Sequence, residues 1–168
     1  MDSFVDIQSF ELAALGSVLF AALLGSLIGL ERALAGKTAG MRTYALVSLG
    51  SCLLTVVSVI VTERYLGLTM FDPLRVAAAI VMGVGFIGSG LVMRQEDRPV
   101  GLTTSAGLWV ASGLGITVGF GYFALAVGTT LITILIFSGL AKVEELLAGN
   151  LRRNAPKVAG IGAKKNSD

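Results

Sequence analysis

The side chains best suited to chemistry in this sequence are charged or hydroxylated residues that flank long apolar stretches. They are Glu31, Arg32, Arg42, Asp72, Arg75, Thr103 and Thr104. Carboxylates at such positions attract cations, and arginines bind carboxylates or phosphates. A simpler alternative is that these residues anchor helix ends and form local salt bridges, such as one between Asp72 and Arg75 three positions apart.

Several kinds of site are excluded by composition. The chain has no histidine and a single cysteine, Cys52, which excludes an intrachain disulfide and metal sites built on His or Cys. Residues 83–88 spell GxGxxG, but they lie within an apolar run rather than at a turn between a strand and a helix. We find no nucleophile beside a general base. We therefore expect a protein that is not an enzyme, with no catalytic residue, no resident metal, no cofactor and no nucleic-acid partner.

The sequence that surrounds these residues has an unusually apolar composition, which determines what kind of element can position them. Of the 168 residues, 54% are hydrophobic and 14% are charged, and the mean hydropathy is +0.82. Soluble domains carry about 25% charged residues. A soluble fold of this size cannot bury so much apolar surface, so lipid must surround it.

Five apolar runs are long enough to cross a bilayer, which takes roughly 20 helical residues. They cover residues 10–30, 44–62, 76–93, 103–118 and 122–141. The last two are separated only by the glycines and aromatics of residues 119–122, which suit a tight turn at the membrane interface. The expected fold class is all-α, an integral membrane bundle of five transmembrane helices, preceded by a short external segment (1–9) and followed by a basic tail (142–168).

The distribution of Lys and Arg predicts the orientation of the bundle. With five spans, residues 31–43, 94–102 and the tail share one side and hold 11 of the 13 basic residues, while Arg64 and Arg75 lie on the other. Cytoplasmic segments retain positive charge. We therefore expect the N-terminus outside and the C-terminus in the cytoplasm.

Small residues at four-residue spacing predict where the helices pack, because lipid provides no hydrophobic gain for helix association. The expected packing glycines are Gly25, Gly29, Gly83, Gly85, Gly88, Gly90, Gly107 and Gly115. The third run is so rich in glycine that two of its sides can approach neighbours, leaving one face for a second copy or a partner. At the helix starts, Asp72 followed by Pro73 forms a good N-cap, and Thr103 and Thr104 are candidates for the same role in the fourth helix.

Three ordered blocks resemble the MgtC/SapB family of membrane proteins. The first joins residues 24–32, LGSLIGLER, to residues 36–43, GKTAGMRT. The second runs from DPLRVAA at 72–78 into GVGFIGSG at 83–90, and the third is VGLTTSAGLWVA at 100–111. All seven flanking residues named at the outset fall within these blocks, so the resemblance marks them as functional candidates.

The resemblance implies a five-span protein of the bacterial inner membrane, tied to magnesium homeostasis and to virulence. It also implies a mode of action: binding and restraining other membrane proteins, such as the F-type ATP synthase, rather than carrying Mg²⁺. Family members often add a cytoplasmic ACT-like domain after the fifth helix. Residues 142–168 are too few for one, so we expect a short form without it.

Two functions follow from these observations. The leading hypothesis is a non-enzymatic regulator that acts through helix contacts under magnesium limitation or envelope stress. No Asp, Glu, Lys, Arg or His lies deep within any of the five runs, whereas transporters usually place such groups there. The alternative is a transporter or channel for Mg²⁺ or another cation, with a path lined by hydroxyls or backbone carbonyls.

Overall fold

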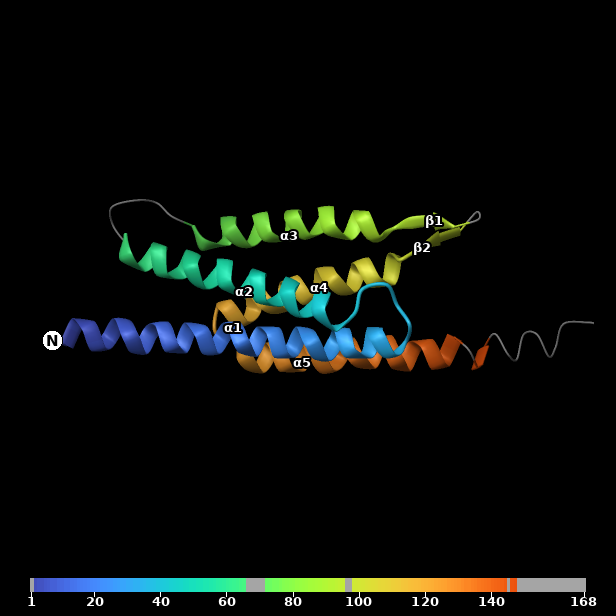
Figure 1. Ribbon diagram of the computed structural model, residues 1–168, viewed down its shortest axis with the longest axis horizontal. Coiled ribbons are helices and arrows are strands. Elements are labelled where there is room, and N and C mark those ends of the chain that lie inside the picture. The colour runs from blue at the N-terminus through green and yellow to red at the C-terminus, as the bar shows by residue number, and fades with distance from the viewer. Residues whose placement is uncertain (1, 66–71, 96–97, 145, 148–168) are drawn as a thin grey trace, which may run out of the picture.

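The protein is a bundle of long helices (Figure 1). The computed structural model describes residues 2–65, 72–95, 98–144 and 146–147. Within them, five helices are long and apolar enough to cross a membrane, which confirms the predicted fold class. The helices are α1 (Asp2–Leu34), α2 (Met41–Arg64), α3 (Pro73–Leu91), α4 (Leu102–Gly119) and α5 (Phe123–Leu135), the last continuing into a π-helical turn, η1 (Ile136–Leu140).

The helix ends differ from the predicted bounds in ways that local chemistry explains. Helix α1 begins at Asp2 rather than near residue 10, since residues 2–9 contain no glycine or proline to stop it. Between α4 and α5, Gly121 adopts a φ of +85°, so the predicted glycine turn is present. The basic tail lies mostly outside the described residues.

The start of α3 matches its predicted cap, whereas the start of α4 does not. Asp72 precedes α3 and its carboxylate accepts a hydrogen bond from the Leu74 backbone N–H at 2.9 Å. Helix α4 instead begins after Gly101, which has a φ of +88° and makes no side-chain cap. The prediction that Thr103 or Thr104 caps α4 is therefore wrong, because both threonines lie within its first turn.

A short hairpin joins α3 to α4 in a segment that sequence analysis treated as a loop. Strand β1 (Met93–Gln95) pairs antiparallel with β2 (Arg98–Val100), with Met93 opposite Val100. In Figure 1 this hairpin projects from the end of the bundle that also carries the α1–α2 connection.

The helices form layers, with α2 and α4 between α1 and α5 on one side and α3 on the other (Figure 1). Helix α4 contacts α1, α2, α3 and α5, and α2 contacts α1, α3 and α4, so these two helices form the centre of the bundle. The start of α1 and the end of α5 lie at opposite ends of the molecule. Helix α3 packs mainly against α4 and α2 and is the least buried span.

Glycines of α1 and α4 allow both helices to lie directly against the backbone of α2. A Cβ on Gly25 would lie 2.6 Å from the Tyr44 carbonyl oxygen, and one on Gly29 would lie 2.6 Å from Met41 Cα. A Cβ on Gly115 would overlap the Ser48 carbonyl oxygen. Such separations exclude any side chain, so these positions fix the distance between the helices.

The remaining predicted packing glycines divide into two groups. A Cβ on Gly107 would overlap the Tyr44 hydroxyl, and one on Gly88 would make ordinary contact with Ser105 at 3.6 Å. By contrast, a Cβ on Gly83, Gly85 or Gly90 would meet nothing within 4 Å. These three glycines of α3 therefore lie on open surface.

Hydroxyl groups supply polar contacts in the interior of the bundle. Ser51 of α2 and Ser112 of α4 are hydrogen-bonded through their Oγ atoms at 3.1 Å. Ser105 of α4 donates to the Gly88 carbonyl oxygen of α3 at 2.7 Å. Hydrogen bonds of this type between membrane helices contribute roughly 0.6 to 2 kcal/mol each.

We expect Gly115→Ala to destabilise the bundle by about 1–3 kcal/mol, because its methyl group must displace the α2 backbone. Gly113→Ala is the matched control, since a Cβ at Gly113 would meet nothing within 4 Å in the same helix. Thermal unfolding in mild detergent would compare the two. Equal unfolding temperatures for both variants would contradict this account of the α2–α4 contact.

Candidate functional site

The most unusual side-chain interaction in the bundle lies in the last turn of α1, between two neighbouring residues. The Arg32 guanidinium donates from Nε to Glu31 Oε2 at 2.5 Å and from Nη2 to Glu31 Oε1 at 2.7 Å. The arginine side chain is 4% exposed and the glutamate side chain 18% exposed. It is the one ion pair among the residues that the structure describes.

Arg32 is held from its other side by an aromatic ring. Its Cζ lies 3.7 Å from the centroid of the Phe137 ring, within the range of a cation–π interaction, which contributes about 2 kcal/mol when desolvated. Phe137 belongs to η1, the π-helical turn that follows α5. Such turns widen a helix locally and occur frequently at functional sites.

Tyr44 connects the start of α2 to α4. It is completely buried, and its hydroxyl donates to the Thr104 carbonyl oxygen at 3.1 Å. The space for the hydroxyl exists because position 107 is glycine: a Cβ there would overlap the Tyr44 hydroxyl and lie 2.7 Å from Phe137 Cζ. Four helices therefore meet around Arg32, Tyr44 and Phe137.

A pocket of about 560 Å³ opens beside the ion pair. Its walls come from the end of α1, the α1–α2 connection, the start of α4 and the helix that continues α5. The lining residues are Glu31, Arg32, Ala35, Lys37, Thr103, Ile136, Phe137, Ser138, Leu140, Ala141, Lys142 and Glu144. The pocket therefore combines charged side chains with one apolar wall.

The structure brings five of the seven sequence candidates to this end of the bundle. Glu31, Arg32 and Thr103 line the pocket. Thr104 is buried beside it and contributes its backbone carbonyl to Tyr44. Arg42 lies in the first turn of α2 at the same end, with its side chain exposed.

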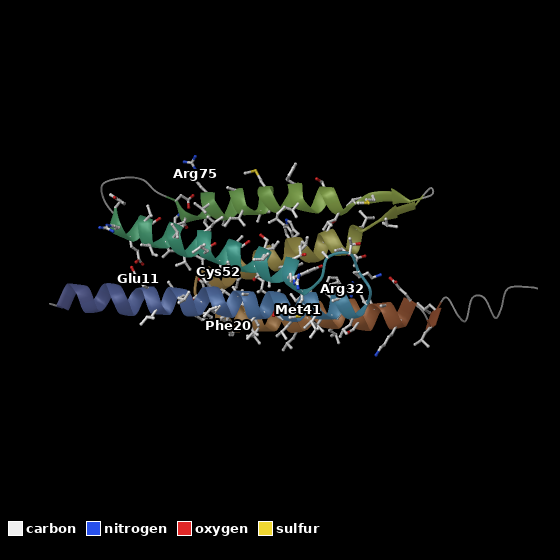
Figure 2. All side chains as sticks on the ribbon, in the orientation of Figure 1. Glu11, Phe20, Arg32, Met41, Cys52 and Arg75 are labelled. Carbon is white, nitrogen blue, oxygen red and sulfur yellow. The ribbon has the colours of Figure 1, made fainter. Side chains whose placement is uncertain are left out.

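The other two candidates, Asp72 and Arg75, lie at the opposite end of the bundle. Figure 2 shows the Arg75 side chain pointing away from α3, whereas Arg32 lies among the helices near the α1–α2 connection. The expected Asp72–Arg75 salt bridge is absent from the described residues, where the one ion pair joins Glu31 and Arg32. Asp72 serves instead as the helix cap.

Sequence reasoning missed Tyr44, Phe137, Lys37 and Lys142 as members of this site. Tyr44 follows Arg42 at the start of a span, where an aromatic residue normally indicates the membrane interface. Phe137 is one of many apolar residues in its run, and no sequence signal distinguishes it. Among the described residues, no three His, Cys, Asp or Glu side chains lie close enough to hold a metal ion.

The sequence matches known proteins of one family. The model of the MgtC family matches residues 18–146. The chain belongs to the MgtC family. This range contains α2, α3 and α4 and every residue that lines the pocket.

Three relatives show the extent of the similarity. Protein SapB of Bacillus subtilis is 41% identical over 68% of this chain and 51% of its own length. Protein MgtC of Salmonella typhimurium LT2 is 39% identical over 77% of this chain and 55% of its own. In Escherichia coli K12 the "Putative magnesium transporter YhiD" is 38% identical over 71% and 56%. The chain thus spans about half the length of these relatives, and no solved structure matches it.

We expect Glu31→Leu to destabilise the protein by about 3–5 kcal/mol, because Arg32 would remain buried without its counter-ion. The double variant Glu31→Leu/Arg32→Met should recover much of that loss, since it removes both charges. Arg75→Met is the control, because its side chain is exposed. Unfolding in detergent would measure all three. A double variant no more stable than Glu31→Leu would show that the unpaired charge is not the cause.

Proposed function

We propose that this protein is a non-enzymatic regulator of the bacterial inner membrane that acts by binding an apolar helix of another membrane protein. The observation that carries the proposal is an open groove between α2 and α3, of about 670 Å³. It is lined by Leu46, Val47, Gly50, Ser51, Leu54, Val76, Ala79, Ile80, Gly83, Val84, Phe86 and Ile87.

The walls of this groove suit a helix because their small residues allow close backbone approach. A Cβ on Gly50 or on Gly83 would meet nothing within 4 Å, so each glycine leaves space that no described part of the chain fills. Ala79 lies one turn before Gly83 on α3. Glycine and alanine at four-residue spacing form the packing surface that membrane helices use for each other.

Magnesium limitation is the condition we propose for this activity. Support comes from family membership and from the relative in Escherichia coli K12, which is named a putative magnesium transporter. The F-type ATP synthase is the first partner to test, because the family resemblance implies it. We also propose that α1 starts outside the cell and that residues 142–168 form a cytoplasmic tail, as the basic residues predict. Reporter fusions with both termini in one compartment would contradict that orientation.

A substitution that places a side chain in the groove tests whether a partner helix binds there. Gly83→Leu should leave stability nearly unchanged but reduce partner co-purification severalfold, because the new side chain occupies the space of the partner's backbone. Gly128→Leu is the matched control, since a Cβ at Gly128 also meets nothing within 4 Å but lies on α5, away from the groove. Cross-linking in magnesium-limited cells, followed by purification, would measure recovery of ATP synthase subunits.

Growth of the same strains across a magnesium series provides the functional result. We expect Gly83→Leu to reproduce the growth defect of a deletion strain at low magnesium and Gly128→Leu to grow normally. Normal growth and full partner recovery with Gly83→Leu would contradict the proposal.

A second function is favoured by a row of buried hydroxyls on α2. Ser48, Ser51, Thr55 and Ser58 follow each other at three- or four-residue spacing and are each at most 4% exposed. Ser48 Oγ has no hydrogen-bond partner among the described residues. Hydroxyl and carbonyl oxygens can line a path for a dehydrated cation, which supports a cation transporter or channel as the alternative.

Transport would be measured directly with purified protein in liposomes. If the alternative holds, the protein should carry Mg²⁺ into the liposomes. Ser48→Ala should then change the rate of Mg²⁺ entry without unfolding the protein. Under the proposed regulatory function, Mg²⁺ flux should not exceed that of liposomes without protein. A protein-dependent flux sensitive to Ser48→Ala would replace the regulator with a transporter.

A further inference from the structure

The pocket beside Arg32 gathers cationic side chains from three separate segments. Arg32 comes from α1, Lys37 from the α1–α2 connection and Lys142 from the helix that continues α5. Lys37 and Lys142 are exposed, and neither is in an ion pair within the described residues. The pocket is separate from the α2–α3 groove, and no lining residue is shared between them.

The side chains that line the pocket carry more positive than negative charge, so the pocket favours an anion. Glu31 is turned toward Arg32 at 2.5 and 2.7 Å, so that carboxylate and one cation compensate each other. Lys37 and Lys142 then face the single remaining carboxylate, that of Glu144. An anion with one negative charge restores the balance.

Arg32 also has hydrogen-bonding capacity left over. A guanidinium carries five N–H donors, and two of them are directed to Glu31. Its third nitrogen, Nη1, is not among the fully buried side-chain atoms without a partner, of which Ser48 Oγ is the one in the described residues. Arg32 lines the pocket, and its guanidinium packs against the Phe137 ring at 3.7 Å.

One wall of the pocket is apolar, which distinguishes its ligand from a free ion. Ile136, Phe137, Leu140 and Ala141 form this wall along η1 and the residues after it. Inorganic phosphate would gain nothing from these side chains. A phospholipid would place its headgroup against the cations and its acyl chain along the apolar wall.

We propose that this pocket binds the phosphate-bearing headgroup of an anionic phospholipid. Arg32 and the two lysines contact the phosphate, and the Thr103 hydroxyl is available for a further hydrogen bond. The pocket lies at the end of the bundle that also carries Arg42, besides the three cations of its lining. Basic pockets between membrane helices are the sites at which anionic headgroups bind.

The test compares lipid retention by purified protein in native mass spectrometry. Wild-type protein should retain phosphatidylglycerol in preference to phosphatidylcholine with the same acyl chains. Lys37→Gln/Lys142→Gln should weaken phosphatidylglycerol binding roughly tenfold or more, since each of the two basic residues contributes about fivefold in affinity for an anionic lipid. Arg64→Gln/Arg75→Gln is the matched control, because it removes two exposed cations from the opposite end.

Three results would overturn the proposal. They are equal retention of the two lipids by wild-type protein, unchanged preference in the lysine variant, and equal loss in the arginine control. A separate arm adds inorganic phosphate at millimolar concentration. We expect no displacement of lipid, and complete displacement would assign the pocket to free phosphate instead. The lipid preference of the wild-type protein is measured without any variant, so the proposal stands or fails even if a variant does not fold.

Discussion

The contact between the backbone of α2 and the glycines of α1 and α4 is the interaction on which the rest of the structure depends. In lipid, apolar side chains gain little by leaving the solvent, so helices associate through close packing and hydrogen bonds. Gly25, Gly29 and Gly115 permit that packing because any side chain at these positions would collide with α2. The bundle is therefore organised around α2 and α4, and α3, whose glycines mostly meet nothing, remains at its edge.

The same close approach creates the pocket at the basic end. Because α1 and α4 lie against α2, Tyr44 reaches the Thr104 carbonyl, and Gly107 leaves space for its hydroxyl. Phe137 fills the neighbouring space and covers Arg32. Burial of a charged pair is costly unless its hydrogen bonds are satisfied. Here two charge-assisted hydrogen bonds and an aromatic ring compensate for the lost hydration.

Hydropathy was sufficient to predict the five spans, and the cap at Asp72 followed from its position before Pro73, because both signals are local. The site was less predictable. Glu31 and Arg32 were recognised by family resemblance, but their pairing was not, since adjacent residues on a helix do not normally face each other. The pair forms because Phe137 and the surrounding helices confine the arginine. Likewise, the spacing of Gly83, Gly85 and Gly90 resembles a packing surface, and only tertiary structure reveals that none of the residues it describes occupies that surface.

The first turn of α4 joins the two surfaces to which we assign binding. Its consecutive residues Thr103, Thr104 and Ser105 face, respectively, the charged pocket, Tyr44 of α2 and Gly88 of α3. Gly88 lies on the helix that forms one wall of the α2–α3 groove. A ligand in the pocket therefore contacts the same turn that fixes α3 to the bundle. A contiguous route of this kind can transmit an effect only if the turn has two arrangements of similar free energy. Because α3 also packs against α2 and α4, a shift of α3 would have to break the hydrogen bond between Ser105 and Gly88 and change both packing contacts.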